Sequence, residues 1–129
     1  LKKEVPGFVE NRVLYAIMRE CLALVDEGVV SADELDVNVK WGIGYKLAVI
    51  PPMHLLDMAG MDIYTAVASY LNPVLSNASE VSPTIKDLVA RGRLGMKSKG
   101  GLFDYTEEEV GALRAERGAS LVKVRKALS

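Results

Sequence analysis

The sequence has very few of the residues that build metal sites and disulfides. Its 129 residues include one cysteine, Cys21, and one histidine, His54. A single cysteine cannot form an internal disulfide, and one imidazole beside it does not make a zinc-binding set. We therefore predict no metal site. The composition is typical of a reducing compartment, so we expect a cytoplasmic protein.

Long apolar runs and an excess of positive charge are also lacking. Charged residues or glycine interrupt every apolar stretch well before the roughly 20 residues that a membrane-spanning helix needs. The 16 Lys and Arg against 17 Asp and Glu give a net charge of -1. Binding to nucleic-acid phosphates or to an anionic membrane takes a large positive excess. We predict neither a membrane span nor a nucleic-acid partner.

The length limits the number of domains. A chain of 129 residues has room for one hydrophobic core, and not for a dinucleotide-binding domain together with a substrate domain. It starts with Leu1 rather than an initiator methionine. We therefore expect it to be a piece of a longer polypeptide.

Helical periodicity is present over most of the chain. Residues 6–27 predict one long helix, with Pro6 in its first turn and Gly28 just after its end. Its apolar side chains recur at steps of three and four residues, which places them on one face. These are Leu14, Ile17, Met18, Cys21 and Val25.

Two capping boxes mark further helix starts. Ser31 with Glu34, and Thr106 with Glu109, have the spacing in which side chain and backbone cap each other. The first predicts a helix that stops before Gly42. The second predicts a polar helix over 106–117, followed by a separate basic helix over 121–128.

Proline and glycine define the helices in between. Pro52 predicts a short helix closed by Gly60, Asp62 is expected to cap the next, and Pro83 predicts another after Ser82. A strand over 46–50 would have no partner, so we predict loop or short helix there. The sequence thus predicts an all-α fold: a single helical domain of six or seven helices, with a long first helix.

Asn11 is the polar residue that the helical pattern explains least. It lies three and seven residues before Leu14 and Met18, and so shares their apolar stripe. A carboxamide buried without hydrogen bonds would cost about 1–3 kcal/mol. Either water reaches Asn11 at the helix end, or a polar ligand meets it.

The remaining candidates have simpler interpretations. No serine or cysteine nucleophile lies at a telling spacing from His54, and Asp57 is three residues on, so we expect a surface or capping histidine. The loop 91–101 holds four cations and four glycines. Such a loop can approach an anion, but it matches no nucleotide-binding motif, and a solvated turn is the simpler interpretation.

Six segments, taken in order, form a specific combination: 6–12 (PGFVENR), 23–36, 42–45 (GIGY), 52–62 (PMHLLDMAGMD), 92–97 (GRLGMK) and 101–105 (GLFDY). Together they resemble the C-terminal domain of the 3-hydroxyacyl-CoA dehydrogenases, up to Tyr105. Pro51, Lys99-Gly100 and Leu102 depart from the family pattern, which affects local loop geometry.

The resemblance implies that residues 1–129 are the helical domain of an NAD-dependent L-3-hydroxyacyl-CoA dehydrogenase of fatty-acid beta-oxidation. Such a domain dimerises and closes over acyl-CoA against an upstream Rossmann domain. That absent domain would bind NAD and carry the catalytic histidine and glutamate, so the isolated chain is expected to be inactive, with no cofactor-binding residue of its own.

The resemblance also implies roles for three residues. Asn11 matches the family's active-site asparagine, whose carboxamide would bind the 3-oxygen of the substrate or orient the catalytic histidine. By position, Pro52 and Met53 are candidates for contact with the acyl chain, and ordinary packing at a helix start is the alternative for both.

Two alternatives remain at this point. One is that the chain is a noncatalytic helical dimerisation module, and the other is that it belongs to a related 3-hydroxy acid dehydrogenase with a non-CoA substrate. Separately, the basic residues 123–126 would suit a linker helix leading into a further domain such as an enoyl-CoA hydratase.

Overall fold

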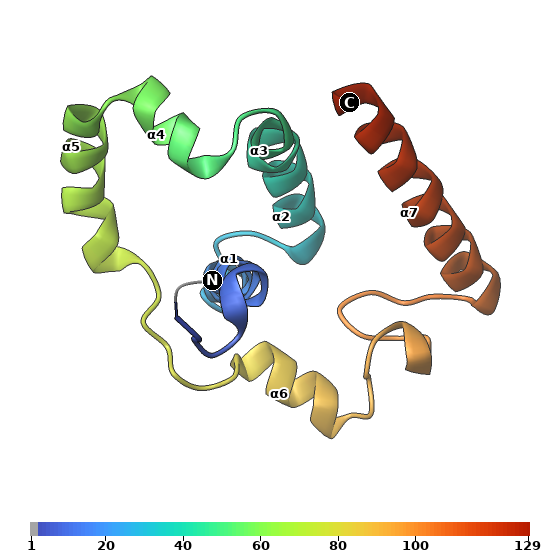
Figure 1. Cartoon of the computed structure of the whole chain (residues 1–129). Helices are drawn as coiled ribbons and strands as arrows, with labels where there is room; N and C mark the ends of the chain where they lie inside the picture. Colours follow the sequence, from blue (N-terminus) through green and yellow to red (C-terminus); the bar gives the residue numbers. More distant parts are fainter. Residues whose placement is uncertain (1–2) are drawn as a thin grey trace. The chain divides into compact units, whose positions relative to one another are not determined.

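The fold is all-helical, as predicted (Figure 1). The computed structural model describes residues 3–129, which contain seven α-helices, one π-helical turn, two 3-10 turns and no β-strand. The chain divides into two compact units, one ending at Thr84 and the other beginning at Ile85. The helices are α1 (Phe8–Asp26), α2 (Ala32–Val39), α3 (Tyr45–Val49), α4 (Pro52–Ala59), α5 (Met61–Leu71), α6 (Pro83–Ala90) and α7 (Glu107–Leu128).

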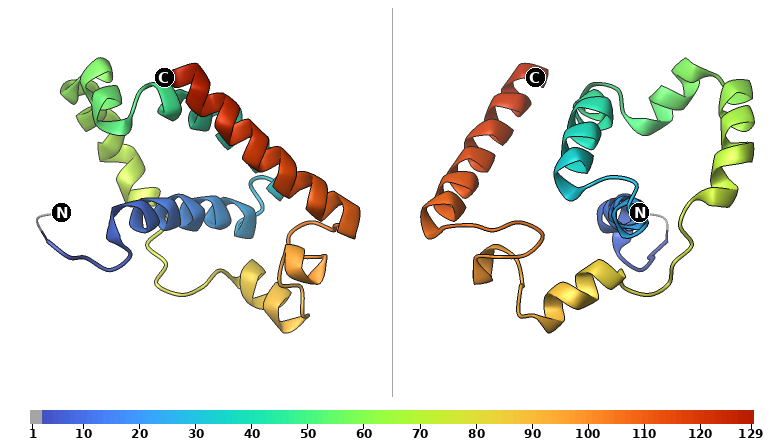
Figure 2. Two further views of the ribbon diagram at one scale, coloured as in Figure 1. Left: turned by 45° about the vertical axis from the view of Figure 1, so that its right-hand side comes forward. Right: turned by 180° about the vertical axis from the view of Figure 1, so that it is seen from behind.

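The long first helix is confirmed as α1, which the left view of Figure 2 shows along its length. It begins after Gly7, whose φ of 78° lies in the left-handed region that glycine adopts readily. Pro6 therefore lies before the helix, and the prediction that placed it in the first turn is wrong. Its polar side chains hold the segment that follows α5. The Glu20 carboxylate accepts the backbone N–H of Ser76 at 2.5 and 3.0 Å, and the Arg19 guanidinium donates to the Ala78 carbonyl at 3.3 Å.

The end of α1 is tied to the start of α6. The Asp26 carboxylate accepts the Ser82 hydroxyl at 2.9 Å, the Thr84 N–H at 3.3 Å and the Thr84 hydroxyl. These bonds lower the pKa of Asp26, with the Thr84 hydroxyl as the largest cause. A carboxylate with three donors is therefore one of the fixed points of the first unit.

The second helix does not stop before Gly42, so that prediction is wrong. Ser31 caps α2 as expected, accepting the Glu34 N–H at 3.3 Å. The backbone then continues through a π-helical turn, η1 (Lys40–Gly44), directly into α3. An interior glycine costs a helix only about 1 kcal/mol, which flanking helical turns outweigh. Residues 46–50 lie in α3 and its end, in agreement with the short helix expected there.

Two further predictions need correction. Asp62 does not cap α5: the helix begins at Met61, its cap position is Gly60 with φ 100°, and no side chain bonds to the cap. Residues 106–128 form one helix and not two, because α7 runs through Gly118 without a break. The capping box at its start is present, with Thr106 and Glu109 bonded reciprocally at 3.1 and 3.2 Å.

Residues 3–129 do not form a closed hydrophobic core. Leu88, at 8% exposed, is the one buried large apolar side chain within residues 3–129. On α1 the predicted inward stripe is far from buried, since Leu14 is 45% and Ile17 42% exposed. A helix that is apolar on most of its surface is normally buried on most of its surface. The apolar faces of these helices are therefore left for another surface to cover.

Candidate functional site

Asn11 lies in the first turn of α1, beside a small cavity. The cavity is open to solvent, has a volume of about 370 Å³ and is lined by five consecutive residues, Gly7, Phe8, Val9, Glu10 and Asn11 itself. Asn11 is exposed, and its carboxamide has no hydrogen-bond partner anywhere in residues 3–129. One amide that both donates and accepts is thus free to meet a ligand.

The backbone before Asn11 has an unusual conformation. Gly7 and Phe8 both have positive φ, at 78° and 49°. Glycine adopts this region at no cost, whereas a bulky side chain is strained there. A Cβ added to Gly7 would lie 3.4 Å from the Arg12 backbone nitrogen. Strain of this kind persists where surrounding structure enforces it, and it is common at functional sites.

This arrangement suits recognition of an oxygen that gains negative charge. The carboxamide N–H of Asn11 is a donor, and the start of a helix carries partial positive charge from its free N–H groups. Glu10 in the same turn adds a carboxylate. Asn11 therefore occupies a position from which it can orient a polar substrate or a catalytic group supplied by another domain.

Pro52 and Met53 lie in the first turn of α4, and neither lines a described cavity. Met53 is 68% exposed. A second cavity of about 400 Å³ lies next to them, lined by Val49, Ile50, Pro51, His54, Asp57 and Met58. Positions 51, 54 and 58 are separated by three and then four residues, and this helical spacing was the signal that could have found this face. Substrate contact by Pro52 and Met53 stays a prediction.

His54 lies at this second cavity together with Asp57. Both side chains are exposed, in line with the surface position expected for the histidine. The cavity walls are otherwise aliphatic or sulfur-containing, so its character is apolar with one imidazole and one carboxylate at its surface. It shares no residue with the cavity at Asn11.

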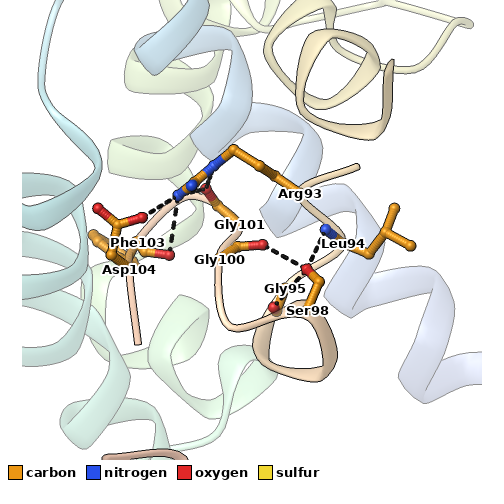
Figure 3. A network of polar contacts seen from close by, with 8 residues as sticks. All are labelled: Arg93, Leu94, Gly95, Ser98, Gly100, Gly101, Phe103 and Asp104. Atoms are coloured by element: carbon orange, nitrogen blue, oxygen red, sulfur yellow. Dashed lines mark hydrogen bonds and ion pairs between the residues drawn. The ribbon is translucent and has the colours of Figure 1, made fainter. Parts of the chain in front are cut away.

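The glycine- and lysine-rich loop is a closed turn organised by Arg93 (Figure 3). The guanidinium donates twice to the Gly101 carbonyl, at 3.1 and 2.9 Å, and once to the Phe103 carbonyl at 3.4 Å. It also pairs with the Asp104 carboxylate at 2.6 Å. Its donors are thus directed at the loop's own backbone and carboxylate.

The glycines of this loop allow close backbone contact within the turn. A Cβ on Gly101 would lie 2.8 Å from the Gly95 Cα atom. The Ser98 hydroxyl accepts the Leu94 N–H at 2.8 Å and contacts the Gly100 carbonyl at 2.9 Å. The geometry favours the interpretation as a structured turn over that of an anion site.

Cys21 is poorly suited to nucleophilic chemistry. Partial burial, with smaller effects from Asp36 and Glu20, raises the pKa of its thiol. A raised pKa leaves less of the reactive thiolate at neutral pH. Within residues 3–129 no three His, Cys, Asp or Glu side chains gather as a metal site would require.

Residues 3–129 do not fit a dinucleotide cofactor. The glycine-rich fingerprint for NAD requires a strand, a tight turn and a helix N-terminus, and this part of the chain has no β-strand.

None of the helices described has the length and hydropathy to cross a membrane.

Comparison with known proteins identifies relatives of two kinds. One is 5-formyl-3-hydroxy-2-methylpyridine 4-carboxylate 5-dehydrogenase of Mesorhizobium japonicum, 55% identical over 99% of this chain and 41% of the relative. A crystal structure of an enzyme of that name, described as an NAD+ dependent dismutase, superposes with a TM-score of 0.96 at 55% identity. It covers 98% of this chain and 41% of that one.

The other relatives are acyl-CoA enzymes. A 3-hydroxybutyryl-CoA dehydrogenase of Clostridioides difficile is 30% identical over 81% of this chain and 36% of its own length. The human mitochondrial hydroxyacyl-coenzyme A dehydrogenase is 30% identical over 80% of this chain and 32% of its own length. The chain thus spans well under half of each relative.

The sequence profile of one family covers most of the chain. It is that of the 3-hydroxyacyl-CoA dehydrogenase C-terminal domain, and it matches residues 7–105. The match begins at Gly7, the glycine with positive φ before α1, and ends at Tyr105, just before α7. The chain therefore belongs to the 3-hydroxyacyl-CoA dehydrogenase family, as its C-terminal helical domain.

Proposed function

We propose that this chain is the substrate-side domain of an NAD-dependent dehydrogenase, with Asn11 as its contribution to the active site. The observation that carries the proposal is the unpartnered Asn11 carboxamide beside a cavity at the start of α1. NAD, which accepts hydride when bound, would be held by a Rossmann domain elsewhere in the same polypeptide.

Asn11 would act by orientation and by polar stabilisation. Its N–H donates to the substrate oxygen at the carbon being oxidised, or its carbonyl accepts from the catalytic histidine of the other domain. Both roles need an amide, because only an amide offers a donor and an acceptor on one short side chain.

For the substrate, we propose a ring carboxylate that is not a CoA ester. The support is the 55% identity along almost the whole chain with an enzyme named for a pyridine carboxylate, against about 30% with enzymes named for CoA esters. This departs from the beta-oxidation substrate that the family resemblance implied. A 3-hydroxyacyl-CoA remains the second candidate, which the family match favours.

The second role of the domain would be dimerisation. The apolar stripe of α1, with Leu14, Ile17 and Met18 each at least 42% exposed, needs a covering surface. A second copy of the chain and the NAD-binding domain together would provide it. If the chain is instead a noncatalytic module, it would still dimerise, but Asn11 would have no role in an active site.

The test of the active-site role is the Asn11→Ala substitution in the full-length polypeptide. We expect kcat to fall by about 10- to 1000-fold, as for loss of one donor to a reacting oxygen. Asn38→Ala is the matched control, because Asn38 is an exposed helical asparagine that bonds only to the Glu34 carbonyl, at 2.8 Å. A kcat that is the same in both variants would make Asn11 a structural residue.

The test of the substrate is a comparison of kcat/KM in the full-length protein. We expect turnover of 5-formyl-3-hydroxy-2-methylpyridine 4-carboxylate to exceed that of 3-hydroxybutyryl-CoA by about 100-fold or more. The reverse order would select the second candidate. The isolated chain should neither bind NAD nor turn over either compound, and activity in it would overturn the two-domain proposal.

A further inference from the structure

The last helix lies outside the part of the chain that the family explains. The family match ends at residue 105, and α7 begins at Glu107. The pyridine carboxylate dehydrogenase relative is aligned over 99% of the chain, so its alignment includes α7. At 22 residues it is also the longest helix described.

One face of α7 carries an apolar stripe that is exposed over most of its length, from Leu113 to Leu128. Its members follow steps of three and four residues along the whole helix, which places them on one side. Leu113 is 44%, Leu121 53% and Leu128 51% exposed. Within the second unit, neither α6 nor the 3-10 turn η3 (Met96–Ser98) packs along it. The stripe consists of Val110, Leu113, Arg117, Leu121, Val124 and Leu128.

The charges of α7 are separated along its axis. The first turn has three glutamates, at positions 107–109, and the last turn has Arg125 and Lys126. Two such helices side by side in parallel would bring like charges together at both ends. If the two helices lie side by side in antiparallel orientation, the acidic end of each lies near the basic end of the other. Charge complementarity therefore favours the antiparallel orientation.

Arg117 provides an independent reason for the antiparallel orientation. It is the single charged member of the stripe. In a parallel in-register pair the two Arg117 guanidinium groups would face each other across an apolar seam, which is costly because neither has a counter-charge. In an antiparallel pair centred near Ala119 they are separated along the axis by about 6 Å, at 1.5 Å per residue.

We propose that two copies of α7 pack antiparallel along this stripe in the homodimer. The spacing of the stripe is nearly the same from either end, as a two-fold axis through the helix centre requires. About Ala119, Val110 lies opposite Leu128 of the partner subunit, and Arg117 lies opposite Leu121 of the partner subunit. The stripe covers itself, with the aliphatic stem of Arg117 lying over leucine.

The flanks of the pair are polar and solvated. The register brings Glu116 near Lys123 of the partner subunit on one flank. On the other flank it brings Arg114 near Arg125 of the partner subunit, and the repulsion between these two like charges is unfavourable. Single exposed pairs interact weakly and are screened by salt, so these two flank contacts contribute little beside the apolar stripe, Arg117 and the opposite charges at the helix ends.

Disulfide trapping in the full-length protein tests both the contact and its direction. In a Cys21→Ser background, Val110→Cys and Leu128→Cys are made singly and together, and each protein is treated with a mild oxidant. The two positions are about 27 Å apart within one helix, so they cannot join within a subunit. We expect the double variant to run mostly as a covalent dimer and each single variant to stay mostly monomeric on a non-reducing gel.

The controls and contrary outcomes are specific. Ala112→Cys with Lys126→Cys has the same axial register on the opposite face of α7 and should not cross-link. Cross-linking of either single variant with itself would mean parallel pairing, and no cross-linking of the double variant would mean that the stripe is covered by something else. Both results would overturn the proposal.

The inference rests on the proposed dimer, and different measurements test the dimer and the α7 contact. Sedimentation equilibrium of the full-length protein reports the dimer itself, and turnover reports the active site. A dimer that is active but not trapped through α7 overturns this inference alone, whereas a monomer overturns the dimer as well.

Discussion

The Arg93 turn and helix α1 show two opposite ways of satisfying side chains. In the turn, Arg93 is bonded to Gly101, Phe103 and Asp104, and the backbone atoms of the loop pair with one another. On α1, Arg19, Glu20 and Asp26 are bonded, whereas Asn11 has no partner in the described residues and apolar side chains such as Leu14 and Ile17 are left about half exposed. The turn is complete in this chain, and α1 is complete only with another surface.

This difference supports the proposed site at the start of α1. The turn holds its shape by short-range bonds, and the Arg93 donors are used within it. The start of α1 has a strained backbone, a free carboxamide at Asn11 and an uncovered apolar face. Groups that are left unsatisfied within one domain are the ones available to a substrate or a second domain.

The largest effect is expected inside the turn, at Gly101. A Cβ there would lie 2.8 Å from the Gly95 Cα atom, and backbone cannot move aside as a side chain can. Gly101→Ala should lower the free energy of unfolding of the full-length protein by about 3 kcal/mol, measured by urea titration.

Its control is another glycine-to-alanine change. Gly118→Ala in α7 has no atom within 4 Å of the new Cβ, and should raise stability by about 0.5–1 kcal/mol through helix propensity. Equal effects at the two positions would mean that the turn is not closely packed.

The next effect compares two neighbouring arginines. Arg93→Ala removes a 30%-exposed guanidinium with four bonds and should cost about 2 kcal/mol. Arg91→Ala removes a surface pair with Asp87, in which the side chains are 57% and 64% exposed, and should cost less than about 1 kcal/mol. Urea titration of both variants measures the difference, and a larger loss at Arg91 would contradict this account of the turn.

A smaller effect tests the open side of the comparison. Ile17 is 42% exposed here, yet Ile17→Ser in the full-length protein should cost about 1.5 kcal/mol, because other surfaces cover it there. Val29→Ser, at a 67%-exposed position after α1, is the control and should cost little. If thermal unfolding gives the two variants the same stability, the α1 face is not covered.

The smallest effect depends on pH. The Thr84 hydroxyl bond holds the pKa of Asp26 below its ordinary value of 3.8. The folded state therefore binds fewer protons than the unfolded state between the two pKa values, and the stabilisation is complete above 3.8 and lost as the pH falls through the folded pKa. The stability difference between the wild type and Asp26→Ala should shrink with acidification, and a constant difference would exclude this linkage.

Much of the helical structure was predictable from local signals. The spacing of the apolar residues predicted α1, although the helix begins two residues after Pro6, and the capping boxes at Ser31 and Thr106 predicted the starts of α2 and α7. These signals act within a few residues, so they do not depend on tertiary structure.

Two of the errors, the early stop of the second helix and the division of the last helix, share one cause, which is that glycine was given too much weight as a helix breaker. Gly42, Gly44 and Gly118 all lie within helical backbone. The cost of one interior glycine is about 1 kcal/mol, and neighbouring turns outweigh it. The covering of the α1 stripe was not predictable either, because periodicity says which side is apolar and not what covers it.

The site was predictable only in part. Asn11 was singled out by its place on an apolar stripe, and the structure puts it at a cavity with no partner in the described residues. The cavity at Pro51 and His54 was missed because two prolines and a lone histidine give no motif. The roles of Asn11, Pro52 and Met53 stay predictions until a substrate is tested.

Amide hydrogen exchange of α1 tests the central claim most directly, namely that this chain is completed by other surfaces. It is measured in the isolated chain and in the full-length protein under the same conditions. We predict that the amides from Leu14 to Val25 exchange far more slowly in the full-length protein. Equal protection in both would contradict the account, because it would mean that α1 is already stable in the chain alone.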